Sequence, residues 1–279
     1  MSNQSVDPYQ HLGFIRNPDG TFTRLNKAVP RTEASSDPSL PIPVLTKDLT
    51  MNQRNNTWLR LFLPRIALSS SNKLPLIIFF HGSGFVELSA ATPMFHDFCV
   101  QMANAAEAVV ASIDFRLKCH DTFFSAGLRA TEEVNDLEPL KIQGLILRQP
   151  FFGGTQRSES ELRLENNPVI PLCVTDLMWE LALPIGADRD HEYCNPWSGN
   201  GVQKFDKLKE LGWRVLVSGN GEDLLVDREI ELAQLMEEKG VRVVKDFVED
   251  GSHGVEIFYP SEANKFIALV KDFIYMISA

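Results

Sequence analysis

Five short apolar runs, separated by segments with helical periodicity, constrain the fold of this chain more than any other feature. The runs are PLIIFF (75–80), VVASI (109–113), IQGLIL (142–147), RVLV (214–217) and VRVVKDF (241–247). Nearly continuous apolar runs of this length are typical of parallel strands that are covered on both faces. The segments 92–108, 224–239 and 261–277 carry apolar side chains at helical spacing, with Gly240 after the second and Ser261 as the N-cap candidate of the third. Strands that alternate with helices predict the α/β class, with a mostly parallel sheet flanked by helices.

The regions outside this alternation predict a small cap. Residues 1–44 combine a polar, loose start, an Asn-Pro-Asp-Gly hairpin and a Pro- and Ser-rich extended segment, and residues 57–64 alternate like a half-buried strand. Residues 155–200 hold a helix-like stretch, 172–183, within Pro- and charge-rich sequence. The length of 279 residues fits one large domain. We therefore expect a single domain over residues 1–279, with 1–44 as an N-terminal cap or extended segment and 155–200 as a cap insertion.

Composition excludes several kinds of partner. The chain has 27 Lys and Arg against 37 Asp and Glu, a net charge of −10, which disfavours nucleic acid and anionic membranes. The sequence contains no run of about 18 uncharged apolar residues, so we expect no membrane span, and the first residues do not resemble a secretory signal. Cys99, Cys119, Cys173 and Cys194 lie far apart, which predicts free thiols, and His191 with Cys194 is too small a set for a metal site. We expect a cytoplasmic protein that binds a small molecule, and its oligomeric state stays open.

A glycine-rich turn follows the first apolar run. The residues are His81, Gly82, Ser83, Gly84 and Phe85. Such a turn at the carboxyl end of a strand can direct several backbone N–H groups at one point, where they stabilise a developing oxyanion in acyl transfer. The alternative is a tight strand-to-helix turn with a surface histidine.

An acid and a base follow two later strands. Asp223 comes after RVLVSGN and His253 after the run that ends near Phe247. The carboxyl ends of parallel strands meet at one edge of a sheet, where active sites collect. An acid that precedes the base in the chain is the order of the α/β-hydrolases. Alternatively, Asp223 could cap the following helix and His253 could be a loop residue. Asp227 is a second candidate for the acid, or a residue of the helix surface.

The chain resembles plant carboxylesterases of the hormone-sensitive-lipase-like group of α/β-hydrolases. The resemblance covers almost the whole chain and rests on these stretches: LTKDL (45–49), RLFLPR (60–65), LPLIIFFHGSGF (74–85), ASIDFRL (111–117), LEPLKIQGLILRQPFFGG (137–154), DLMWELALPIGADRDHEYCNP (176–196), LGWRVLVSGNGEDLLVDR (211–228) and SHGV (252–255). It implies a cofactor-free hydrolase of small acyl esters with an α/β-hydrolase fold and a small cap. By the same resemblance Asp223 orients His253, His253 is the general base, and the amides of residues 82–84 form the oxyanion hole.

The nucleophile that this chemistry needs is missing. No G-x-S-x-G sequence occurs in the chain, and the nearest serine, Ser125, has Phe123 where the first glycine belongs. Only 24 residues separate Leu117 from Ile142, enough for one crossover helix. We infer an internal deletion of one helix, one central strand and the nucleophile elbow. Ser83 is a second departure, because the family has glycine there.

Three functions remain after this comparison. The first is a truncated carboxylesterase with weak activity or none. The second is a non-catalytic protein that binds a small hydrophobic ligand, as the related gibberellin receptors do; the presence of His253 speaks against it, because the receptors replace this histidine. The third is an enzyme that uses Ser125 or a bound water.

Overall fold

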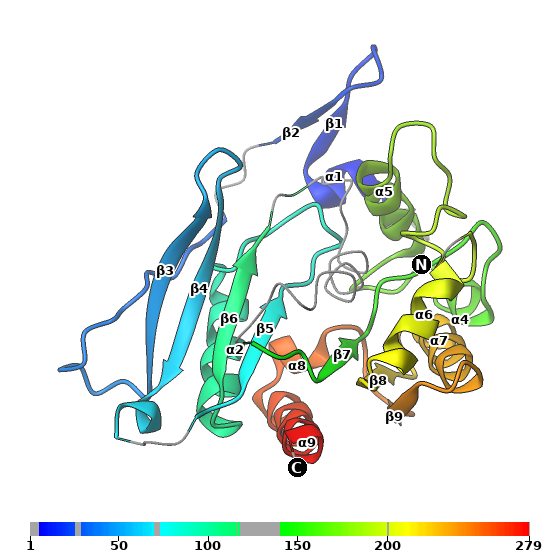
Figure 1. Cartoon of the computed structure of the whole chain (residues 1–279). Coiled ribbons are helices and arrows are strands. Elements are labelled where there is room, and N and C mark those ends of the chain that lie inside the picture. Colours follow the sequence, from blue (N-terminus) through cyan, green and yellow to red (C-terminus); the bar gives the residue numbers. More distant parts are fainter. Residues whose placement is uncertain are drawn as a thin grey trace. The chain divides into compact units, whose positions relative to one another are not determined.

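The computed structural model describes residues 6–25, 29–69, 73–115, 117, 140–199 and 201–278. The chain divides into two compact units, and each is described by itself (Figure 1). Unit 1 comprises Met1–Lys27, Gly84–Val86 and Lys118–His253, and unit 2 comprises Ala28–Ser83, Glu87–Leu117 and Gly254–Ala279. The expected single domain, with its two cap segments, stays a prediction.

Unit 2 contains a mixed four-stranded sheet in the order β3-β4-β6-β5 (Figure 1). Its strands are β3 (Val44–Asn52), β4 (Thr57–Pro64), β5 (Leu76–Phe80) and β6 (Val109–Asp114), and a 3₁₀ turn, η1 (Arg65–Leu68), follows β4. β3, β4 and β6 are antiparallel neighbours, whereas β5 lies parallel to β6 with Ile78 opposite Ala111. The alternating run 57–64 and the apolar runs 75–80 and 109–113 are therefore strands, as predicted. β3 was not predicted, and six of its residues, 47–52, are exposed.

Three helices complete unit 2: α2 (Pro93–Ala105), α8 (Val255–Phe258) and α9 (Pro260–Ser278). Helix α2 contacts β4, β6 and α9, and its Phe98 packs against Phe79 of β5 and Phe266 of α9. Both long helices lie where the periodicity predicted them. The N-cap prediction for Ser261 is wrong, because α9 already begins at Pro260, whose fixed φ suits a first helical position.

Strand β5 is less covered than its apolar sequence predicted. Leu76 and Ile78 are 42% and 48% exposed, while Phe79 on the other face packs against α2. Among the described residues β5 pairs only with β6, and β7 of unit 1 pairs only with β8. Both strands therefore have an open edge within the described part of the chain. These are the two strands that the inferred deletion predicted would lose their common neighbour.

Unit 1 begins with a capped helical turn and a hairpin. Asp7 accepts hydrogen bonds from the first turn of α1 (Pro8–Leu12), so the predicted loose start is ordered from this residue on. The strands β1 (Phe14–Arg16) and β2 (Phe22–Arg24) form the predicted hairpin. Helix α1 packs on α5 (Leu172–Ala182), which confirms the helix expected at 172–183.

The second part of unit 1 is a parallel sheet in the order β7-β8-β9 (Figure 1). Its strands are β7 (Gly144–Arg148), β8 (Arg214–Asn220) and β9 (Arg242–Val248), and its helices are α4 (Glu159–Arg163), α6 (Gly201–Glu210) and α7 (Val226–Glu238). Central strand β8 is almost wholly buried, as its apolar run predicted. Its side chains share a core with Phe205, Leu232 and Met236, each fully buried. Gly240 has φ +80° and follows α7, the position at which glycine commonly ends a helix.

In the described part of the chain, no helix is long and apolar enough to cross a membrane. Cys99, Cys173 and Cys194 are free thiols, as expected from their spacing, and Cys119 lies outside the described residues.

Candidate active site

The turn after β8 fixes Asp223 in the interior of unit 1. Its side chain is fully buried. The backbone N–H of Asp223 donates to Asn220 O at 3.1 Å, and the N–H of Leu225 donates to Asp223 Oδ1 at 3.1 Å. The N–H of Gly221 donates to Val248 O at 2.8 Å, which ties this turn to the end of β9. These hydrogen bonds hold the backbone of Asp223 and its Oδ1 atom, so they fix the orientation of the carboxylate.

His253 lies against the other oxygen of this carboxylate. Its Nδ1 is 2.7 Å from Asp223 Oδ2, and its side chain is 28% exposed. The loop that carries His253 is held by Asn220 Nδ2, which donates to Ser252 O at 2.9 Å, and by Gly251, whose φ of +99° favours glycine. A carboxylate beside Nδ1 keeps the proton on that nitrogen, so Nε2 is the nitrogen that can accept one. The structure thus brings together the predicted acid and base as an orienting carboxylate and a histidine with a free-base nitrogen.

A third side chain, which sequence reasoning missed, reaches the same carboxylate. Gln149 follows β7, and its Nε2 donates to Asp223 Oδ2 at 2.8 Å. No motif marks this glutamine. Its position becomes visible only because β7 and β8 are parallel neighbours, so that their carboxyl ends coincide.

The glycine-rich turn has a left-handed backbone, a conformation that glycine adopts more easily than the serine at position 83. Ser83, Gly84 and Phe85 all have positive φ, of 89°, 58° and 65°. L-residues rarely adopt this region, so Ser83 and Phe85 are strained where glycine would not be. The Ser83 hydroxyl donates to Glu87 O, which gives the side chain a local partner. The turn is thus formed despite the replacement of a glycine.

His81, at the head of this turn, is not a surface residue. It is 4% exposed, its ring stacks on Phe115 at 4.4 Å between centroids, and Nδ1 donates to Gly82 O at 2.9 Å. Burial lowers the pKa of His81, and the contact with Gly82 only partly opposes this. The alternative of a turn with a surface histidine is therefore wrong, and His81 is a neutral structural residue of unit 2.

The remaining candidates separate from the acid and base. Asp227 accepts a hydrogen bond from Ser160 N at 2.6 Å, so this carboxylate serves α4 rather than His253. His191 Nδ1 accepts from Tyr193 N at 3.2 Å, and no group of three metal-ligating side chains occurs within the described ranges. Ser125 lies outside the described residues.

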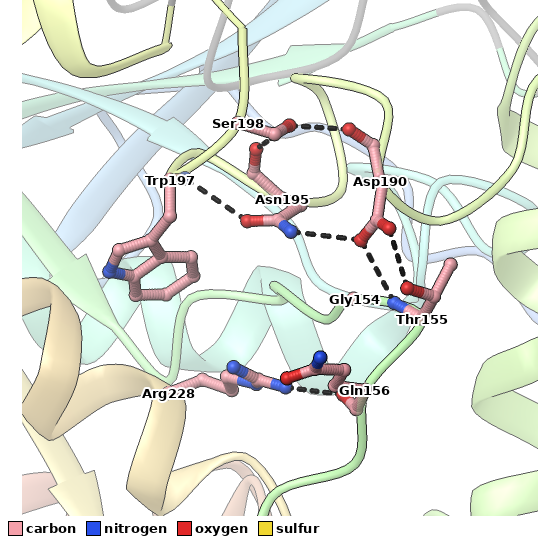
Figure 2. A pocket seen from close by; sticks show the side chains of 8 residues that line it. All are labelled: Gly154, Thr155, Gln156, Asp190, Asn195, Trp197, Ser198 and Arg228. Carbon is pink, nitrogen blue, oxygen red and sulfur yellow. Dashed lines mark hydrogen bonds between the residues drawn. The ribbon is translucent and has the colours of Figure 1, made fainter.

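Two hollows lie on unit 1. One, of about 450 Å³, is bordered by residues 162–168, Glu222 and Ser252, next in sequence to the acid and base. The other, of about 340 Å³, is lined by the polar cluster of Figure 2, in which Asp190 accepts from Thr155 and Asn195. Polar groups that line this second hollow are bonded to one another, which indicates a structural cluster.

A buried carboxylate in contact with a histidine, each in a loop that follows a strand of a parallel sheet, is an arrangement typical of α/β-hydrolases. The family model described as alpha/beta hydrolase fold matches residues 77–134 and 124–257. The chain belongs to this family, and within it to the plant carboxylesterases, because it is 40% identical to Carboxylesterase 20 of Arabidopsis thaliana over 98% of both chains.

Other relatives and solved structures agree. A 3-O-acetylpapaveroxine carboxylesterase of Papaver somniferum is 35% identical over 96% of this chain and all of its own length. A gibberellin receptor of Arabidopsis thaliana is more distant, at 26% identity over 92% of this chain and 87% of the receptor. The esterase of Pyrobaculum calidifontis superimposes with a TM-score of 0.67 at 20% identity, covering 86% of this chain and 87% of its own. This last similarity confirms the α/β-hydrolase fold.

Proposed function

We propose that this chain is a carboxylesterase-family protein that retains the acid and base of ester hydrolysis but not the serine that they serve. The observation that carries this proposal is the 2.7 Å contact between His253 Nδ1 and the buried Asp223. A fully buried carboxylate with no catalytic role would be costly to retain, whereas an ionised acid beside a general base is required for acyl transfer. The substrate class that we propose is a small acyl ester, which the acetyl ester in the name of the Papaver relative supports.

In the complete reaction, the roles of these residues follow from their atoms. His253 Nε2 accepts the proton of a serine hydroxyl while the serine oxygen bonds to the ester carbon. Asp223 stabilises the resulting imidazolium, and the amides of Gly82, Ser83 and Gly84 bind the oxyanion. The imidazolium then gives the proton to the leaving alcohol as the tetrahedral intermediate collapses to an acyl-serine. A water molecule, deprotonated by His253 Nε2, attacks the acyl-serine, and its collapse releases the carboxylic acid and returns the proton to the serine. No cofactor enters this sequence.

We propose that the internal deletion stops this reaction at its first step. The alignment with Carboxylesterase 20 runs over 319 positions, whereas 98% of this chain is about 273 residues, so about 46 positions have no residue here. The family model matches in two pieces that overlap at residues 124–134, within the same region. Ser125 lacks the glycine before it and the apolar strand that would form a strained elbow. Without an aligned nucleophile, only a slow attack by water assisted by His253 remains.

Intact-mass spectrometry after treatment with a fluorophosphonate probe tests this proposal. We expect no adduct on the folded protein. We also expect the unchanged protein to hydrolyse p-nitrophenyl acetate at most about ten times faster than the His253→Ala variant does. An adduct on Ser125 that disappears in both Ser125→Ala and His253→Ala would overturn it, because it would show a rebuilt elbow. A Ser5→Ala variant, at a serine outside every motif, is the matched control for non-specific labelling.

The non-catalytic binder is the second candidate, and the gibberellin receptor relative is the observation that favours it. Retention of His253 in contact with Asp223 favours the hydrolase origin more strongly. Saturable binding of a hydrophobic ligand by the adduct-free protein, unchanged in His253→Ala, would support the binder. A cytoplasmic location is a further proposal, which the free thiols Cys99, Cys173 and Cys194 support. The absence of a nucleic-acid partner is another, which rests on the net charge of −10.

A further inference from the structure

Gln149 has a backbone conformation that its residue type does not favour. Its φ is +47°, in the left-handed region, and it directly precedes Pro150. Its backbone N–H donates to Ser218 O at 2.9 Å, which continues the ladder between β7 and β8 by one residue. Glycine would adopt this conformation with less strain. A strained non-glycine residue at the end of a strand points to a use for its side chain.

The Gln149 amide joins the two loops that carry the acid and the base. Nε2 is 2.8 Å from Asp223 Oδ2 and 3.5 Å from Ser252 O. One amide nitrogen has two hydrogens, so a single side chain can donate to the carboxylate after β8 and to the loop after β9. Gln149 is 7% exposed and Asp223 is fully buried, so water is a poor substitute for this donor.

The acceptor is the same oxygen that receives the histidine. Asp223 Oδ1 accepts from Leu225 N, whereas Oδ2 accepts from both His253 Nδ1 and Gln149 Nε2. Without the amide, Oδ2 would keep, among the described residues, only the contact with His253 Nδ1. The carboxylate could then rotate about its terminal torsion, and the 251–253 loop would lose one of its ties.

We propose that Gln149 is a positioning residue that locks Asp223 and the His253 loop in the arrangement needed for general-base catalysis. This inference rests on the proposed roles of Asp223 and His253. It makes the β7–β8 pairing part of the site, because the pairing determines where the amide is placed. It also accounts for the strained backbone, since the left-handed conformation directs the side chain to the acid.

Proton NMR of the His253 Nδ1–H tests the proposal without requiring turnover. An imidazole N–H bonded to a buried carboxylate gives a far-downfield resonance, assigned by its absence in His253→Ala. We expect this resonance in the unchanged protein and expect Gln149→Met, which keeps the length of the side chain but has no donor, to lose it. Gln149→Gly removes the donor and also relieves the strain of the positive φ. If this variant loses the resonance as well, the loss is caused by the missing donor and not by backbone strain. Gln101→Met, on α2 of unit 2, is the matched control and should keep the resonance.

The conservative variant Gln149→Glu provides a rescue. Its carboxylic acid can donate to Asp223 Oδ2 at low pH, so we expect the resonance at acidic pH and its loss when the new acid ionises. A resonance unchanged in both Gln149→Met and Gln149→Gly would overturn the positioning role while leaving the Asp223–His253 pair intact. Absence of the resonance from the unchanged, folded protein would instead overturn the pair itself, and with it the proposed function.

Discussion

Substitution of Gly221 by alanine tests whether the turn that holds Asp223 is as closely packed as the structure indicates. A Cβ built on Gly221 would lie 2.0 Å from Glu249 O and 2.9 Å from Glu249 C. Both are backbone atoms, so no flexible side chain can move aside. The backbone of Gly221 is not in the left-handed region, so the strain that alanine would cause in the folded state is steric.

The expected loss of stability follows from the atoms that must move. Overpacking of a closely packed site costs about 1–3 kcal/mol. A shift of the turn away from β9 would also weaken the 2.8 Å bond from Gly221 N to Val248 O, a contribution of about 1 kcal/mol. The lower entropy of the unfolded alanine chain returns about 0.4–1 kcal/mol. We expect a net decrease of about 2 kcal/mol in the free energy of unfolding.

Urea denaturation followed by tryptophan fluorescence measures this decrease. Gly82→Ala is the matched control, because no atom lies within 4 Å of its Cβ position and its φ is ordinary. We expect the control to differ from the unchanged protein by less than about 0.5 kcal/mol. Equal stabilities for Gly221→Ala and Gly82→Ala would refute the packing argument, since the two sites would then be equally open.

Three further predictions concern stability. Burial lowers the pKa of both His81 and His96, and the charge of Arg60 adds to this effect at His96. Because the unfolded chain therefore binds more protons below about pH 6.5, the free energy of unfolding should fall as the pH drops below that value. A flat profile of this free energy from about pH 7.5 to about 5.5 would contradict the prediction. Asp48→Ala leaves the buried Arg60 guanidinium without the carboxylate that it contacts at 2.6 Å and 2.8 Å. We expect the free energy of unfolding, measured by urea titration, to fall by about 1–3 kcal/mol, less than for a fully buried pair because Asp48 is half-exposed. Phe205→Ala removes a fully buried ring from the core beneath β8 and should cost about 3–5 kcal/mol by the same assay; a loss below about 1 kcal/mol would mean that the core collapses to fill the space.

Much of the fold was predictable because local pattern and burial coincide. The apolar runs at 109–113 and 214–217 became β6 and β8, and the hairpin turn lies where Asn-Pro-Asp-Gly required it. The acid and the base were predictable for the same reason: Asp223 and His253 follow strands, and parallel strands end at one edge.

Features that depend on neighbours distant in sequence were not predictable. Residues 47–52 of β3 are exposed, with Leu49 and Met51 among polar residues, and the pairing of β3 with β4 makes this stretch a strand. The exposure of Leu76 and Ile78 depends on the open edge and uncovered face of β5 among the described residues, not on the run itself. The residues alone left both Asp223 and Asp227 open as the acid, and the structure separates them: Asp223 contacts His253, whereas Asp227 accepts from Ser160 N.

The sequence by itself determined the α/β class, the alternation of strands and helices, the positions of Asp223 and His253 after predicted strands, and the absence of a G-x-S-x-G sequence, because each of these depends on residues close together in the chain. The tertiary structure alone decided which carboxylate meets His253, that His81 is buried, and that Gln149 contacts Asp223. The register of β7 and β8 places Asp223, 74 positions after Gln149, within hydrogen-bonding distance of the Gln149 side-chain amide, and Ser252 O, 103 positions after Gln149, lies 3.5 Å from the same nitrogen. Strand register depends on which faces are buried in the assembled core, so residues far apart in the sequence decide it together.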